Sequence, residues 1–573
     1  MGATHSSGMP PTEPLRIGNA SGFYGDRFSA VREMLEGGPL DVLTGDYLAE
    51  LTMLILGRTL MKDPNAGYAR TFLSQMEESL GLAMDKGVRI VSNAGGLNPK
   101  GLAEAMHELG ERLGLHPKIA YVEGDNLRQR AAELDLGAPL TANAYLGGWG
   151  IAEAIRRGAD VVVTGRVTDA SVVVGPAAAH FGWARDDWDR LAGATVAGHI
   201  LECGAQATGG NYAFFKEIDA RHPGFPLAEI HADGSSVITK HPGTGGAVTV
   251  ETVTAQLLYE IGGPRYAGPD VTSRFDTIEL AQDAADRVRV TGVRGEPPPP
   301  TMKVCLNHLG GFRNSVVFVL CGLDIEEKAA LIREQVEAAL EKEPAEIVWS
   351  LARTDRASAT TEEEASAFLR VTAKDPDGSV VGRVFSRAAI ELALASYPGF
   401  HVTAPPMDAS PYGVYTAAFV DPALIEHAVV LPGGERVTIE PSSSTQPLED
   451  PAPAALPEPL PTGTTRREPL GLVAGARSGD KGGTANIGVW ARSQDGWRWL
   501  ANALTVQELR KLLPETADLP VTRYVLPHLR AVNFVIDGIL GEGVSSSARF
   551  DPQGKALGEW LRSQIMPIPE VLL

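Results

Sequence analysis

Short apolar runs that end in glycine, asparagine, aspartate or serine recur along the first third of the chain. Five of these runs predict strands, each followed by a polar loop and the start of a helix: residues 14–17, 40–43, 88–91, 118–122 and 159–164. A strand–loop–helix rhythm that repeats in this way predicts a parallel sheet with helical crossovers. We therefore expect an α/β fold, with a large N-terminal domain built on a mainly parallel sheet.

The run VVVTGRVTDAS (161–171) changes most abruptly from apolar to charged. Its β-branched residues are typical of a buried strand. Arg166 and Asp169 follow directly, at the edge of the sheet where open α/β folds bind ligands. We expect this pair to line a site; the alternative is a loop ion pair, which at the surface would contribute little stability.

The pattern becomes less regular beyond residue 190. It predicts strands at 287–293, 315–324 and 347–352, a charged amphipathic helix at 326–344, and a strand followed by a helix at 379–396. We place this whole region in the second half of the same large domain.

Residues 441–469 are dense in proline, serine and threonine, which predicts an extended linker. Residues 470–573 interleave strands and helices and predict a small C-terminal α+β domain, ferredoxin-like in its order. The expected organisation is thus a main domain over 14–440, the linker, and the C-terminal domain. The first dozen residues are expected to form a disordered tail.

Charge and cysteine content narrow the functional classes. The 573 residues are 44% hydrophobic and 21% charged, as in soluble globular proteins, and carry a formal net charge of −20. That charge argues against nucleic acid and anionic membranes as partners. Three scattered cysteines predict neither a disulfide framework nor a zinc site. With no apolar run long enough to span a membrane and no signal peptide, we expect a cytoplasmic protein.

Polar residues follow the predicted strands, and in a parallel sheet their loops meet at one edge. These candidate substrate-binding residues are Asn19, Ser21, Asp46, Asn93 and Asp125. Carboxylates and amides gathered there suit acid–base work or a divalent cation. Each aspartate is equally suited to capping a helix, and we predict no metal site.

Two glycine-containing loops are candidates for holding an anion. Gly95 and Gly96, with Lys100 nearby, open a predicted helix whose N-terminus suits an anion. A plain tight turn explains that loop nearly as well. In the C-terminal domain, Arg477 and the Asp480–Lys481 turn suit a phosphate or a carboxylate. The alternative there is a hairpin with a solvated ion pair.

The stretch LECGAQATGGNY places Glu202 beside Cys203. Glu202 is a candidate general base if burial raises its pKa. Cys203 is a candidate nucleophile, although a buried structural cysteine is the favoured interpretation.

Seven stretches together resemble the acyclic terpene utilisation (AtuA-like) family, in the family's order and over nearly the whole chain. They are RIGNASGFYGDR, VLTGDYLAELTM, SNAGGLNPKGL, VTGRVTDASVVVGP, ECGAQATGGNY, ARSGDKGGTANIGV and LPHLRAVNFVIDGILGEGVSSSARFDPQGKALGE. The resemblance implies a main domain followed by an AtuA-like ferredoxin-fold domain. It also implies a place in bacterial catabolism of citronellol and geraniol, which proceeds through CoA thioesters and a biotin-dependent carboxylase. It identifies no chemical step.

We therefore expect an enzyme that acts on an acyl-CoA or a related branched carboxylic acid, by hydratase, dehydratase or lyase chemistry. Asp169 or Glu202 would be the base, while Arg166, Asn93 and the amides near Gly95 would hold an oxyanion or a carboxylate. Lys100 and the loop from Arg477 to Lys481 would contact CoA phosphates; no other cofactor is predicted.

Two alternatives stay open at this point. The first is a non-catalytic acyl-CoA-binding or assembly subunit of a carboxylase pathway, and the weaker second is metal-assisted hydrolysis. The size of the chain favours a homo-oligomer.

Overall fold

The computed structural model describes residues 13–573, so the expected N-terminal tail lies outside the described residues. The chain forms two compact units. The first joins the chain up to residue 307 with 415–544 and 553–573, and the second joins 308–414 with 545–552. None of the helices within 13–573 is both long and apolar enough to cross a membrane.

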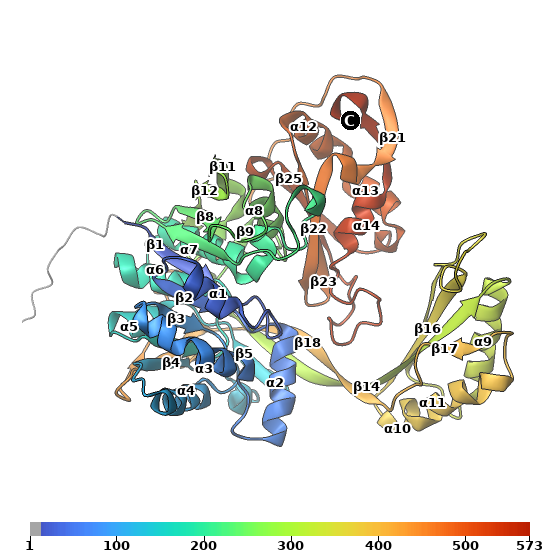
Figure 1. The fold of residues 1–573 in the computed structure, drawn as a ribbon, viewed down its shortest axis with the longest axis horizontal. Helices are drawn as coiled ribbons and strands as arrows, with labels where there is room; N and C mark the ends of the chain where they lie inside the picture. The colour runs from blue at the N-terminus through green and yellow to red at the C-terminus, as the bar shows by residue number, and fades with distance from the viewer. Residues whose placement is uncertain (1–12) are drawn as a thin grey trace, which may run out of the picture. The chain divides into compact units, whose positions relative to one another are not determined.

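Five parallel strands form the centre of the first unit (Figure 1). In sheet order they are β1 (Leu15–Asn19), β2 (Val42–Gly45), β3 (Arg89–Ser92), β6 (Val161–Thr164) and β4 (Ile119–Glu123). All five match the predicted strands, which confirms the α/β fold class. Their carboxyl ends therefore lie at one edge of the sheet.

Antiparallel strands extend this centre on both sides into an eleven-stranded sheet. Beyond β1 lie β7 (Pro226–Ile230), β8 (Ser236–Lys240), β12 (Arg287–Thr291) and β11 (Glu279–Ala284), and beyond β4 lie β19 (Ala428–Val430) and β20 (Arg436–Thr438). Parallel pairing is thus confined to the centre. Short turns such as that at Gly234, with φ of 87°, join β7 to β8, and a turn of this length can connect only antiparallel strands.

Helices cover both faces of the parallel centre, and this explains the continuous apolar runs. Val161 and Val163 pack into one hydrophobic core, whereas Val162 between them packs into the other. The first core includes α1 (Ala30–Gly37), α3 (Arg70–Asp85) and α4 (Pro99–Leu113); the second includes α5 (Trp149–Arg156), α6 (Ser171–Phe181) and α7 (Trp188–Glu202). A strand buried on both faces has no polar side to alternate with.

The C-terminal residues form the expected small α+β domain. Its antiparallel sheet consists of β22 (Ala474–Lys481), β23 (Thr484–Ala491), β25 (Ala531–Ile536) and β24 (Val521–Leu526). Its helices are α12 (Gln494–Ala503), α13 (Val506–Leu512) and α14 (Leu557–Ser563), and β21 (Thr465–Pro469) pairs with β26 (Ile565–Pro569). Residues 441–464 before it contain neither helix nor strand.

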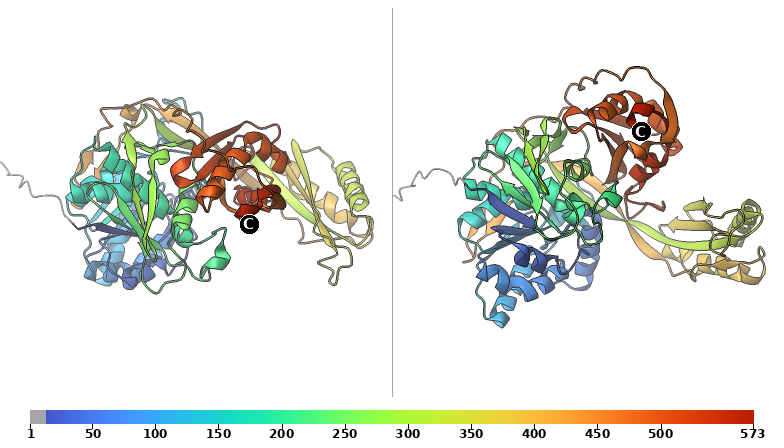
Figure 2. Two further views of the ribbon diagram at one scale, coloured as in Figure 1. Left: turned by 90° about the horizontal axis from the view of Figure 1, so that it is seen from above. Right: turned by 45° about the horizontal axis from the view of Figure 1, so that its top comes forward.

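The second unit, yellow in Figures 1 and 2, has its own core. Its sheet contains β15 (Glu346–Ala352), β16 (Ser366–Asp375), β17 (His401–Val402) and most of β14 (Met302–Cys321), with α9 (Ile325–Ala339) and α11 (Arg383–Ile390). The strand predicted from residue 379 is wrong: Gly378–Val381 is helical. The side chain of Asp377 accepts a hydrogen bond from Ser379 N and so caps this turn.

Candidate functional site

The loops that follow β2 and β3 meet at the carboxyl edge of the sheet, where Asp46 and Asn93 are both buried. Asn93 Nδ2 donates to Asp46 Oδ1 at 2.5 Å, and its Oδ1 accepts from Tyr47 N at 2.8 Å. Burial raises the pKa of Asp46 well above its usual range, and the charge of Asp169 raises it further. Both effects favour the protonated form of Asp46 in its buried, amide-lined position.

Arg166 is the central cation of this edge, and its side chain is only 4% exposed. Its Nη1 donates to Asp169 Oδ1 at 2.7 Å and to the carbonyl of Leu48 at 3.2 Å. The guanidinium lies over the ring of Tyr145, 4.4 Å from its centroid. Asp169, at 29% exposed, remains open to solvent. The ion pair considered from the sequence does exist, but its cation is buried and held in one position.

Asp125 supports the loop that carries Arg166. Its Oδ2 accepts from Arg166 N at 2.9 Å and from Asn143 Nδ2 at 2.7 Å. A side chain at Gly165 would place its Cβ 2.2 Å from Asp125 Oδ1, so only glycine fits there. Burial raises the pKa of Asp125 to about 6. We infer that Asp125 is a positioning residue for Arg166.

The end of α7 adds a buried pair in which His199 Nδ1 lies 2.9 Å from Glu202 Oε1. Asn19 holds this helix end, because its Nδ2 donates to the carbonyl of Leu201 at 2.6 Å. The other oxygen, Glu202 Oε2, is buried and has no hydrogen-bond partner among residues 13–573. An unpartnered buried oxygen in a native site calls for an explanation, and a ligand is one.

The electrostatics of this pair favour a protonated Glu202. Burial raises the pKa of Glu202 well above its usual range, Asp169 raises it further, and Lys481 and Arg166 lower it. Burial and the charge of Lys481 lower the pKa of His199 to about 4. Both shifts favour the uncharged forms, in which a carboxyl group can donate to an imidazole. A carboxyl group whose pKa is raised in this way can act as a general acid as well as the base considered from the sequence.

The C-terminal domain brings its β22–β23 hairpin to the loop that follows α8 (Val250–Leu257). Lys481 Nζ donates to the carbonyl of Glu260 at 2.9 Å and lies 5.5 Å from the centroid of Tyr266. Arg477 lies over the ring of Tyr259 at 4.7 Å and donates to the carbonyl of Asn211 at 3.1 Å. We call the charged groups gathered here the cluster: Asp46, Arg166, Asp169, Glu202, Glu260, Arg477 and Lys481. Both predicted cations belong to it, and each already has contacts there.

A second acidic group lies where the hairpin meets this loop. Lys555 Nζ is 2.9 Å from Glu260 Oε1 and 3.6 Å from Asp480 Oδ1. Burial raises the pKa of Glu260 and of Asp480 to about 8, and it lowers the pKa of Lys555 to about 8. Glu260 and Lys555 still expose 35% and 38% of their side chains, so water reaches this group.

A further cation, Lys303, was not singled out from the sequence, and it contacts the same tyrosine ring as Arg166. Lys303 lies over the rings of Tyr145 and Tyr415, at 4.9 Å and 5.5 Å. Burial lowers the pKa of Lys303, whereas Glu50, the first residue of α2 (Glu50–Lys62), raises it. A lone lysine in the apolar stretch MKVCL was the available signal for Lys303. No local signal marked Glu50, Glu260 or Lys555.

Some predicted site residues lie outside this cluster or only support it. Lys100 is 65% exposed, and its nearest acid is Glu104 at 3.9 Å. Gly95 and Gly96 form a packed turn, in which a Cβ on Gly95 would lie 2.4 Å from the carbonyl oxygen of Thr164. Ser21 is buried and donates to the carbonyl of Phe23. Cys203 adjoins Glu202, and burial raises its pKa well above the usual thiol value, which disfavours a nucleophilic thiolate.

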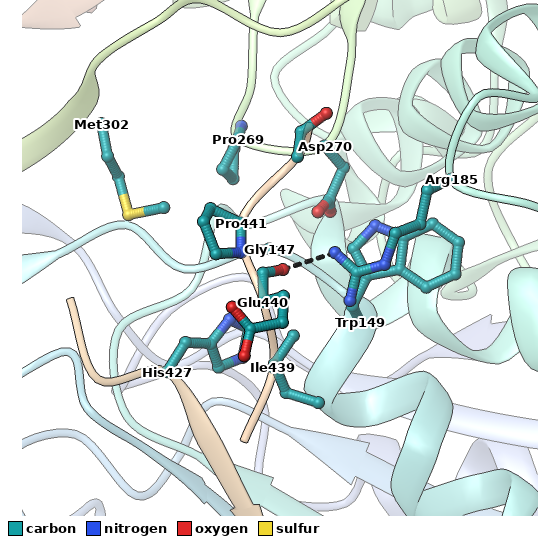
Figure 3. A pocket seen from close by; sticks show the side chains of 11 residues that line it. Gly147, Trp149, Arg185, Pro269, Asp270, Met302, His427, Ile439, Glu440 and Pro441 are labelled. Atoms are coloured by element: carbon teal, nitrogen blue, oxygen red, sulfur yellow. Dashed lines mark hydrogen bonds between the residues drawn. The ribbon is translucent and has the colours of Figure 1, made fainter. Parts of the chain in front are cut away.

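Figure 3 shows a small cavity elsewhere in the first unit, where Arg185 Nη1 donates to the carbonyl of Glu440 at 2.5 Å. His427 and Asp270 also line it. Its volume of about 30 Å³ has room for water but not for an organic substrate.

Among residues 13–573 there is also no group of three or more histidine, cysteine, aspartate or glutamate side chains arranged to hold a metal ion.

Two family models match the chain. Residues 15–431 match the acyclic terpene utilisation family protein AtuA, and residues 468–567 match the AtuA ferredoxin-like domain. The two matches include the sheet edge with Arg166 and Glu202 and the hairpin with Lys481. No curated protein sequence matches the chain.

Proposed function

Because this chain belongs to the acyclic terpene utilisation family, we propose that it is an acid–base enzyme acting on a branched carboxylic acid or its CoA thioester, by hydration, dehydration or a lyase reaction. The observation that carries this proposal is the buried cluster around Arg166. There, the carboxyl groups of Asp46 and Glu202 have raised pKa values beside fixed cations.

The charge balance of the cluster supports an anionic substrate or transition state. Four carboxyl groups have pKa values raised to about 8 or well above the usual range: Asp46, Glu202, Glu260 and Asp480. These shifts favour the uncharged form of each carboxyl group, while Arg166 and Lys481 supply positive charge. Buried cations of this kind, in a chain of net charge −20, would attract carboxylates and stabilise an enolate oxygen.

For hydration, we assign one role to each of three groups. Asp169 takes a proton from a water molecule whose oxygen bonds to the β-carbon of an α,β-unsaturated substrate. The electron pair of the double bond moves to the carbonyl oxygen as an enolate, which Arg166 holds. Glu202 then delivers its proton to the α-carbon. Dehydration is the reverse sequence, and in both directions water and the two protons balance.

The position of the C-terminal domain favours this proposal over a non-catalytic assembly subunit. A separate binding module would have no need to bring Lys481 close enough for its charge to lower the pKa of Glu202. Contact between CoA phosphates and Lys100 or Arg477 finds less support, because Lys100 lies outside the cluster and Arg477 is engaged with Tyr259 and Asn211. The thioester end of the substrate is the part that we place in the cluster.

Turnover assays test this proposal. Purified protein would be incubated with 3-methylcrotonyl-CoA, geranyl-CoA and the free acids in H₂¹⁸O, and products would be analysed by mass spectrometry. We expect ¹⁸O in a hydroxy product, and a rate at least about 100-fold lower in Asp169→Asn, the loss typical of a removed general base. Lys100→Gln is the matched control and should keep the full rate. Binding of these thioesters without any conversion would favour the assembly subunit instead.

A further inference from the structure

We propose that the protein has a second binding site, a pocket for an aliphatic carboxylic acid, at the end of α2 away from Glu50. The pocket lies between the C-terminal half of α2 and the loop that contains Arg128. Its volume is about 440 Å³, within the range of small-molecule sites. The inference rests on this pocket alone and is independent of the chemistry proposed for the cluster.

The wall of the pocket indicates the chemical class of its ligand. Its apolar side chains are all aliphatic: Leu60, Met61, Leu97 and Leu140. Among residues 13–573, no aromatic ring lines the pocket, and nucleobases and aromatic ligands are usually stacked on such rings. Met61 is 68% exposed, which leaves a large apolar side chain for a ligand to cover. The wall therefore favours a flexible hydrocarbon chain.

The rim of the pocket supplies one available cation. The guanidinium of Arg128 makes no hydrogen bond or ion pair with any side chain or carbonyl in the described part of the chain, and the residue is exposed. Arg130 beside it is engaged, with Glu133 Oε1 and the carbonyl of Leu424 both at 2.6 Å. A free guanidinium at the mouth of an aliphatic pocket matches a carboxylate at the end of a hydrocarbon chain.

The pocket and the cluster share α2 but do not share a ligand position. From Glu50, near the cluster, to Gly57, in the pocket wall, seven helical residues span roughly 10 Å. Gly57 lets α2 approach Thr141, because a Cβ there would lie 2.7 Å from the Thr141 methyl carbon. An acid whose carboxylate is held by Arg128 keeps that carboxylate outside the cluster. The pocket thus binds an aliphatic acid that is a product or an effector, not one positioned for reaction.

Calorimetric titration with octanoate tests the pocket. We expect one octanoate per chain, with affinity reduced at least about tenfold in Arg128→Gln, since a hydrogen bond to a charged group is lost. Met61→Asp, which places a like charge in the wall, should abolish binding. Both positions are exposed, so these variants should fold. Arg112→Gln, a surface arginine paired with Glu77, is the matched control and should bind as the wild type does.

Two outcomes would contradict the proposal that this pocket binds an aliphatic acid. One is octanoate binding that is unchanged in both Arg128→Gln and Met61→Asp; the other is octan-1-ol binding as tightly as octanoate. If octanoate binding is instead lost in Glu202→Gln and kept in Arg128→Gln, the acid binds the cluster, and the proposed function stands without the pocket. If Arg128→Gln loses octanoate while no thioester is ever converted, the pocket stands and the proposed function fails.

Discussion

Two neighbouring loops of the sheet, after β3 and after β6, have similar local sequences, but their cations differ in burial. Each follows a buried strand, contains glycine, carries a cation and leads into a helix. After β6, Arg166 is buried and held by Asp169, Leu48 and Tyr145; after β3, Lys100 points into solvent beside Glu104. A cation at a strand end therefore becomes part of a site only when surrounding groups bury and fix it.

Replacing each of these two cations by a neutral residue should give the largest difference in stability and in turnover. Arg166→Gln removes a buried charge and leaves Asp169 and the Leu48 carbonyl without their partner, which should cost about 3 kcal/mol of unfolding free energy and abolish turnover. Lys100→Gln should change stability by less than about 0.5 kcal/mol. Urea unfolding measures both. Equal, small effects from the two substitutions would mean that the difference in burial has no energetic consequence.

A smaller effect on stability is expected from substituting two glycines, one tightly packed and the other with space beside it. Gly165→Ala places a methyl group against Asp125, and overpacking of this kind typically costs about 1–3 kcal/mol. Gly81→Ala, in α3, has only the side chain of Leu115 at 3.7 Å and should stabilise the helix by roughly 0.5–1 kcal/mol. Thermal unfolding of the two variants should therefore shift in opposite directions, and a stabilised Gly165→Ala would contradict the close contact with Asp125.

The pH dependence of stability should be the smallest and most gradual effect. Burial raises the pKa of Glu260 from 4.5 to about 8, so between these values the folded protein binds more protons than the unfolded chain. Unfolding free energy should accordingly fall as pH rises from about 4.5 to 8. Thermal unfolding of Glu260→Gln over this range should show a weaker decline than the wild type. An identical decline in the variant would assign it to other groups.

The centre of the fold was predictable because both faces of its strands are buried. Runs such as Val161–Val163 are apolar throughout, and glycine marks where they end. Parallel pairing then places Asp46, Asn93 and Arg166 at one edge without further information. Only the second half of the twenty-residue β14 was predicted, and the separate unit of residues 308–414 was not, since both depend on contacts distant in sequence.

Several members of the cluster could not be predicted from local pattern. Glu260 and Lys555 are brought together only when the C-terminal domain packs against the loop after α8. Glu50 is a first-turn acid of α2, a position where carboxylates are common, so its sequence position alone does not mark a site. The burial of Glu202, and hence the direction in which its pKa is shifted, is a property of the tertiary structure that its local sequence does not contain.

The central claim is that Glu202 delivers a proton to the α-carbon of the substrate. Its most direct test is deuterium incorporation at the α-carbon of 3-methylcrotonyl-CoA and its hydration product in D₂O, followed by mass spectrometry for the wild type and Glu202→Gln. We expect deuterium at that carbon in the wild type and at least about a 100-fold slower incorporation in the variant. Undiminished incorporation in Glu202→Gln would contradict it.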